Sequence, residues 1–166
     1  MIDIKNSAET TTTVMSKALS VELDVVTDIE APAHAVWRVL RATPRYGEWN
    51  PFIVSIEGAV AVGGRVAVLL ALPDRQPQTL RPKIIELREG RILAWRGRVG
   101  VPGVLDAEHR LEVQEADSRH CRFVQHERFT GVLVPAVRSV LTVNTPAAFL
   151  AMNTALAQQA RVGRAA

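Results

Sequence analysis

The stretch 135–161 constrains the fold more than any other part of the chain. It carries no charged residue between Arg138 and Arg161, and its apolar side chains recur at the spacing of an amphipathic helix. Such a helix would be roughly 39 Å long, enough to cross a small domain. Pro146 is internal, so we expect it to kink the helix or divide it in two. The apolar positions are Val137, Val140, Leu141, Ala148, Phe149, Met152 and Leu156.

The same stretch is long enough to cross a bilayer, but its polar side chains argue against a membrane span. Hydrocarbon does not satisfy so many polar groups, so we interpret the stretch as a helix packed within a protein. We find no signal peptide, which makes the cytoplasm the expected location. The polar positions are Ser139, Thr142, Asn144, Thr145, Asn153, Thr154, Gln158 and Gln159.

Composition restricts the classes of function. The chain has 166 residues, of which 48% are apolar, so it can form one domain with a substantial core. Its net charge is only +3, and basic residues alternate with acidic ones, which argues against a nucleic-acid partner. Cys121 is the single cysteine, so no disulfide framework or CxxC metal knuckle exists.

We predict three segments along the chain. Residues 1–20 are polar and Thr-rich and are expected to form a flexible arm, and 162–166 a short tail. Residues 21–161 form the single domain. It begins with a half-buried strand at 21–29, then a helix opened by Ala31-Pro32 and stopped by Thr43-Pro44, then an aromatic-rich turn or short helix at 46–52. Six strands are predicted next, at 52–57, 65–72, 80–88, 92–99, 105–114 and 119–130.

The order of these elements predicts an α+β architecture. Several links between strands are short, so neighbouring strands should pair in antiparallel fashion. A curved antiparallel sheet of about seven strands, wrapped around the long terminal helix, would enclose the apolar faces of both.

Several motifs resemble one known superfamily. Their order along the chain is similar to that of the START-like (SRPBCC) superfamily, which has the helix-grip fold, and of its polyketide cyclase/dehydrase branch in particular. The match covers about 21–159. The motifs are Ile29-Glu30-Ala31-Pro32 before Val36-Trp37, Tyr46-x-x-Trp49-Asn50-Pro51-Phe52, Val62-Gly63, Leu93-x-Trp95, His109-x-Leu111, His126-Glu127-x-Phe129-x-Gly131 and Phe149-x-x-Met152-Asn153-x-x-Leu156.

The resemblance implies a deep cavity between the sheet and the long helix. Members of the superfamily include aromatases and cyclases, lipid carriers, receptors and chaperone co-factors, so the fold alone does not fix the function. A largely apolar cavity with a few convergent polar groups is the usual form of a small-molecule site.

Two polar residues break the apolar face of the predicted strands. His109 shares a face with Ala107 and Leu111, and Glu127 shares one with Phe123 and Phe129. A turn near Asp117 or Ser118 would place His109 opposite Gln125 or Glu127, within direct or diagonal reach.

The His109–Glu127 pair has two interpretations. It could act as a catalytic acid/base pair that abstracts a proton next to a carbonyl or protonates a leaving hydroxyl, as aldol cyclisation and dehydration require. Alternatively, it could be a structural hydrogen bond or an anchor for a ligand oxygen. A buried carboxyl should in either case raise its pKa or find a cation.

The remaining candidate ligand contacts are mostly aromatic. A plain core position is the alternative for Trp49, Trp95, Phe149 and Met152. Asn50 is interpreted as a turn residue, and Asn144 and Asn153 either line a cavity or bond to the sheet. The candidates are Trp49, Phe52, Trp95, Phe123, Gln125, Phe129, Phe149 and Met152.

We find no signature of a cofactor or metal. No GxSxG, GxGxxG or GxxxxGK motif is present, and Cys121 alternates with His120 and His126 to opposite faces of one strand. Our first hypothesis is therefore a hydrophobic ligand-binding protein, with cofactor-free cyclase, aromatase or dehydratase activity if it is an enzyme. The alternatives are a non-catalytic carrier or sensor, and an adaptor with a vestigial cavity. The state of assembly stays open, with a homodimer among the options.

Overall fold

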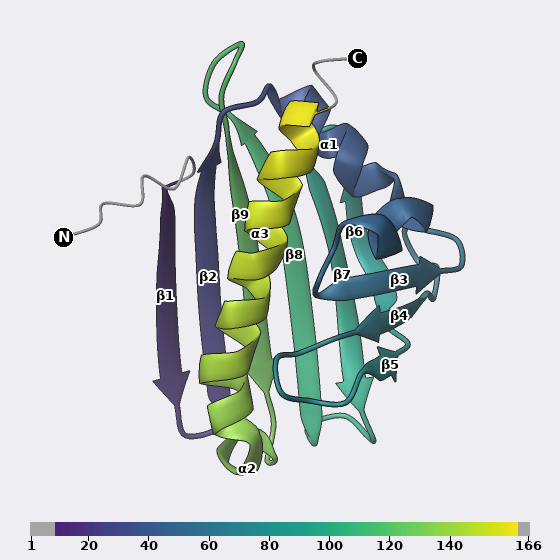
Figure 1. Ribbon diagram of the computed structural model, residues 1–166. Coiled ribbons are helices and arrows are strands. Elements are labelled where there is room, and N and C mark those ends of the chain that lie inside the picture. The colour runs from purple at the N-terminus through teal and green to yellow at the C-terminus, as the bar shows by residue number, and fades with distance from the viewer. Residues whose placement is uncertain (1–8, 163–166) are drawn as a thin grey trace, which may run out of the picture.

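The protein is described by a computed structural model that covers residues 9–162 (Figure 1). A six-stranded antiparallel sheet has the order β1-β2-β9-β8-β7-β6, and β3-β4-β5 form a smaller antiparallel sheet. The strands are β1 Thr10–Lys17, β2 Ser20–Ile29, β3 Ile53–Glu57, β4 Ala67–Leu70, β5 Gln78–Leu80, β6 Lys83–Arg88, β7 Ile92–Val99, β8 Leu105–Glu115 and β9 Cys121–Thr130.

The predicted α+β helix-grip class is confirmed. Strands β2 and β9 alternate buried and more exposed residues along most of their lengths, which fixes one face of the sheet toward the interior. The long C-terminal helix lies across that face, as Figure 1 shows. Residues from the sheet and the helix form one continuous apolar cluster.

The C-terminal helix has three parts, α2 Val134–Ser139, η2 Val140–Asn144 and α3 Thr145–Val162. The segment η2 is a π-helix that ends just before Pro146. Proline has no N–H to donate, so a local change in hydrogen bonding at this point is expected. The hydroxyl of Thr145 donates to the Val140 carbonyl at 3.2 Å and supplies one of the bonds there. The predicted interruption thus takes the form of a π-helical turn.

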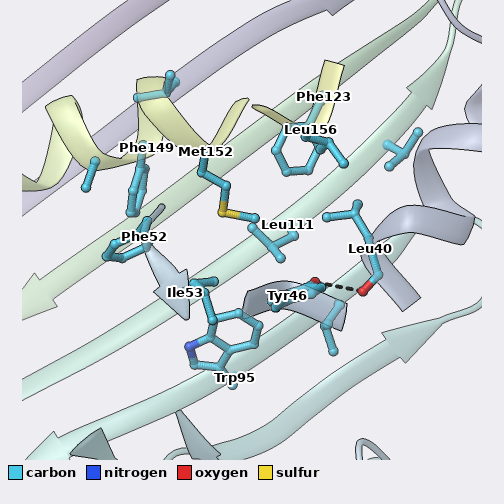
Figure 2. Close-up of a cluster of buried hydrophobic side chains, with 14 of the residues drawn as sticks. Leu40, Tyr46, Phe52, Ile53, Trp95, Leu111, Phe123, Phe149, Met152 and Leu156 are labelled. Atoms are coloured by element: carbon cyan, nitrogen blue, oxygen red, sulfur yellow. Dashed lines mark hydrogen bonds between the residues drawn. The ribbon is translucent and has the colours of Figure 1, made fainter. Parts of the chain in front are cut away.

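Residues 134–161 are apolar and long enough to span a bilayer by length and composition alone. Phe149, Met152 and Leu156 on this helix are nevertheless fully buried within the protein. Figure 2 shows these three side chains directed toward Phe52, Leu111 and Phe123. The helix is therefore the core helix of the fold.

Two short helices, α1 Ala33–Arg41 and η1 Thr43–Glu48, follow β2. Tyr46 is fully buried, and its hydroxyl donates to the Leu40 carbonyl at 2.7 Å, which ties η1 to α1 (Figure 2). Asn50 ends this region as the sequence predicted, because its Oδ1 accepts from the backbone N–H groups of Phe52 and Ile53.

Two details of the prediction are corrected. The arm expected at 1–20 is not loose over its second half, because Thr10–Lys17 pairs with β2 as an edge strand. The strand expected at 80–88 is divided at Arg81-Pro82 between the two sheets. Pro82 has no N–H for the ladder and restricts the residue before it, which explains the break. Residues 1–8, and 163–166 of the predicted tail, lie outside the described residues.

Candidate functional site

A cavity of about 290 Å³ lies between the large sheet, the β3–β5 sheet and the C-terminal helix. Its walls are mostly apolar. The sheet contributes side chains from β7, β8 and β9, and the helix contributes them from its first half. The lining residues are Phe52, Val68, Leu70, Leu72, Arg75, Gln76, Gln78, Leu80, Pro82, Trp95, Gly97, Arg98, Val99, Leu105, Ala107, His109, Glu127, Phe129, Val137, Val140, Leu141 and Thr145.

His109 and Glu127 both line this cavity, on adjacent strands. The register of β8 and β9 places them directly opposite each other, which was one of the two pairings expected. His109 is 3% exposed and Glu127 7% exposed, so the fold buries both almost completely. The strand alternation that predicted their common face therefore also predicted their proximity.

The two residues do not form the hydrogen-bonded pair that a buried acid and base would suggest. His109 Nε2 instead lies 3.0 Å from Oε1 of Gln125, the diagonal neighbour. Within residues 9–162, no hydrogen bond or ion pair engages the Glu127 carboxyl group. Glu127 therefore presents an unpartnered carboxyl group to the cavity.

Burial shifts the pKa values of both groups toward their neutral forms. Desolvation raises the pKa of Glu127 from 4.5 to about 8. Desolvation also lowers the pKa of His109 from 6.5 to about 3, with the bond to Gln125 opposing this shift. At pH 7 the site consequently holds a protonated carboxylic acid beside a neutral imidazole.

Aromatic side chains hold the His109 ring on three sides. Phe149 stacks on it with a centroid distance of 4.7 Å and an angle of 5° between the ring planes. Trp95 meets it edge to face at 4.9 Å, and Phe52 lies 6.3 Å away. These contacts fix the plane of the imidazole before any ligand binds.

A chain of buried hydrogen bonds continues behind His109. Gln125 Nε2 donates to the Asn153 side-chain oxygen and, at 3.3 Å, to the backbone carbonyl of Phe149. Asn153 Nδ2 in turn donates to the Thr27 hydroxyl at 2.9 Å, and that hydroxyl lies 2.8 Å from the Thr10 hydroxyl on β1. The chain links the cavity wall to the edge of the sheet.

The other predicted ligand contacts divide into two groups. Phe52, Trp95 and Phe129 line the cavity. The rest do not line it. Trp49 packs edge to face on Tyr46, Gln125 stands behind His109, and three side chains lie wholly in the core. Those three are Phe123, Phe149 and Met152.

The sequence prediction did not include the polar residues at 75–78 or Arg98 among the ligand contacts. Arg75, Gln76 and Gln78 lie on or next to the β4–β5 connection, and Arg98 lies on β7, where it pairs with Asp106. All four are exposed yet border the cavity. An irregular connection has no periodicity from which its direction can be inferred. Asn144, which donates to the Pro73 carbonyl at 3.0 Å, anchors this connection to the helix.

Comparison with known proteins identifies the family. The model of the family described as polyketide cyclase / dehydrase and lipid transport matches residues 20–161. The chain belongs to this family. A search of curated proteins gives no match.

Solved structures show the same fold at low sequence identity. The aromatase/cyclase Zhui from Streptomyces sp. R1128 is 19% identical with a TM-score of 0.66, over 86% of this chain and 94% of that one. Norcoclaurine synthase from Thalictrum flavum is 16% identical with a TM-score of 0.63, over 94% and 98%. A protein from Nitrosomonas europaea is 17% identical with a TM-score of 0.64, over 92% and 100%. At such identities the likeness concerns the fold alone.

Proposed function

We propose that this protein binds a hydrophobic, carbonyl-bearing small molecule in its cavity and catalyses its cyclisation or dehydration without a cofactor. The observation that carries the proposal is the juxtaposition of His109 and Glu127, two buried titratable groups on facing positions of β8 and β9 in an otherwise apolar inner wall. The matched family is described as polyketide cyclase / dehydrase and lipid transport, so its members include enzymes of this class of chemistry as well as carriers.

The protonation states assign the roles. Neutral His109 acts as the base, and protonated Glu127 acts as the acid. With a β-hydroxy ketone, His109 takes the proton from the carbon next to the carbonyl while the Glu127 proton joins the leaving hydroxyl. The C–O bond breaks, a C=C bond forms and water leaves. The imidazolium then returns its proton to the Glu127 carboxylate.

The two charges arise together in this step. A single charge in so apolar a cavity would be costly, but an imidazolium facing a carboxylate is created as a pair. The cavity volume of about 290 Å³ lies at the lower end of the range for ligand pockets. We therefore expect a compact substrate of one or two rings, or the equivalent open chain.

The test is native mass spectrometry of the protein with a panel of polycyclic aromatics, linear poly-ketones and fatty acids. A ligand recovered lighter by one water supports dehydration or cyclisation. The variants His109→Gln and Glu127→Gln should then retain binding and lower turnover by about 10²- to 10⁴-fold. His126→Gln is the matched control, because His126 pairs with Asp24 on the other face of β9.

A carrier or sensor that uses the same cavity is the second candidate. The specific observation in its favour is the low pKa of His109, which makes the imidazole a weak base in the empty cavity. In that case His109 and Glu127 would only anchor oxygens of the ligand. A panel member that binds and is recovered unchanged, with both variants weakening its affinity, would replace the catalytic proposal by this one.

A further inference from the structure

The hydrogen-bond chain behind His109 decides which of its two ring nitrogens carries the proton. A neutral imidazole can hold its proton on Nε2 or on Nδ1, and its hydrogen-bond partners select one form. The partner of Nε2 is the side-chain amide of Gln125. The orientation of this amide therefore determines which tautomer of His109 is favoured.

A backbone carbonyl fixes that orientation. The Phe149 carbonyl oxygen can only accept a hydrogen bond, and it lies 3.3 Å from the outer amide atom of Gln125. That atom must then be the nitrogen, because an oxygen there would face the carbonyl oxygen with no proton between them. Gln125 consequently turns its oxygen toward His109.

Asn153 reinforces the same orientation. Its oxygen accepts from Gln125 Nε2, while its nitrogen donates to the Thr27 hydroxyl at 2.9 Å. Gln125, Thr27 and Asn153 are each no more than 1% exposed. Water therefore does not compete for these bonds, and reversal of one amide would leave a buried donor or acceptor without a partner.

We propose that Gln125 and Asn153 are positioning residues that hold His109 as the neutral tautomer with its proton on Nε2, so that Nδ1 is the atom offered to a ligand. Nε2 must donate to the Gln125 oxygen, which leaves the lone pair on Nδ1. Within residues 9–162, no side chain or backbone group bonds to Nδ1, and the ring borders the cavity. The stacked Phe149 ring and the edge of Trp95 fix the direction of that lone pair.

This inference rests on the proposed function for its catalytic meaning, because the base in that reaction would be His109 Nδ1. The tautomer itself is a property of the free protein. It can therefore be measured without a substrate.

The experiment is ¹⁵N NMR of the imidazole nitrogens in the uniformly labelled full chain at pH 7. The chain has four histidines, and the signal lost in His109→Gln identifies His109. The expected result is a protonated Nε2 and an unprotonated Nδ1. A proton on Nδ1, or on both nitrogens, in the wild-type protein would overturn the proposal.

Variants test whether the hydrogen-bond chain through Gln125 and Asn153 fixes the tautomer of His109. Gln125→Met removes the acceptor at similar volume, and the ratio of the Nε2–H to the Nδ1–H tautomer should fall by about fivefold or more. Met152→Leu, at a fully buried position beside Asn153, is the control and should leave the ratio unchanged. Asn153→Ala removes one of the two acceptors of the Gln125 amide and should shift the ratio in the same direction by less.

These outcomes separate the two proposals. A ratio that stays the same in Gln125→Met and in Asn153→Ala would refute the positioning role, even if the protein dehydrates its substrate. A ratio that falls as expected supports the role, even if every panel ligand is recovered unchanged. If Gln125→Met does not fold, the wild-type spectrum and Asn153→Ala still decide the question.

Discussion

Glu127 combines an energetic cost of burial with the role that we propose for it. Its carboxyl group is almost completely buried in an apolar wall and has no partner among the described residues. Because burial raises its pKa, the group is held in the protonated form. A structural role would more often provide such a group with a hydrogen bond. The unpartnered state supports our proposal that this carboxyl group contacts an oxygen of the ligand.

Glu127 should make the protein less stable as the pH rises. Its pKa is about 8 in the folded state against 4.5 ordinarily, so the folded state binds more protons between these values. The free energy of unfolding should then fall by about 1.4 kcal/mol per pH unit across this window, relative to Glu127→Gln. Urea denaturation of both proteins from pH 5 to 9 measures the difference. A constant difference would show that Glu127 is ionised in the folded state.

At the scale of elements, the site depends on the loop that carries the chain from β9 into α2. Gly131 begins this loop with a φ of +134°, and its N–H donates to the Leu19 carbonyl at 3.0 Å. A Cβ at this position would lie 2.4 Å from the Val104 carbonyl oxygen. The close backbone contact sets where the first half of the helix, which borders the cavity, meets the sheet.

Gly131→Ala should therefore destabilise the protein by about 3 kcal/mol, from backbone strain and from the clash with Val104. Gly63→Ala is a matched control, because Gly63 also has a positive φ, +87°, but a Cβ added there would meet no other atom within 4 Å. It should cost only about 1 kcal/mol. Thermal and urea denaturation measure the loss of stability in each variant. Equal losses in Gly131→Ala and Gly63→Ala would mean that the loop between β9 and α2 shifts to accommodate the added Cβ.

At the scale of the whole molecule, the cavity exists because the helix and the two sheets do not close completely over β7 and β8. On α3, the side chains of Phe149, Met152 and Leu156 are fully buried in the core. Nearer its start, Val137, Val140 and Leu141 border open space instead. The cavity therefore lies where the large sheet, the β3–β5 sheet and the C-terminal helix meet without packing completely.

Ala107 provides a test of the cavity as the binding site. It lies on β8 in the cavity wall, and Ala107→Leu would fill part of the volume. We expect panel ligands to lose at least tenfold in affinity while the free energy of unfolding stays equal or rises by about 1 kcal/mol. Native mass spectrometry and urea denaturation provide the two readings. Ala107→Ser keeps the volume and should keep the affinity, and unchanged binding in Ala107→Leu would place the ligand elsewhere.

Local patterns in the sequence determined much of the fold. Alternation along 105–114 and 119–130 follows from the two-residue period of a strand, so it predicted the two strands, their buried faces and the nearness of His109 to Glu127. The helical period likewise predicted the C-terminal helix, and the missing N–H of Pro146 predicted its interruption.

The tertiary structure decided what local patterns do not encode. Thr10–Lys17 has little apolar surface of its own and becomes a strand only because β2 offers it an unpaired edge. His109 bonds to Gln125 rather than Glu127 because Asn153 and the Phe149 carbonyl, from a distant helix, orient the Gln125 amide. Likewise, residues 75–78 border the cavity because of where the irregular β4–β5 connection meets the C-terminal helix. The contacts of Gln125 and of Asn144 join segments far apart in the chain, so only the packed fold determines them.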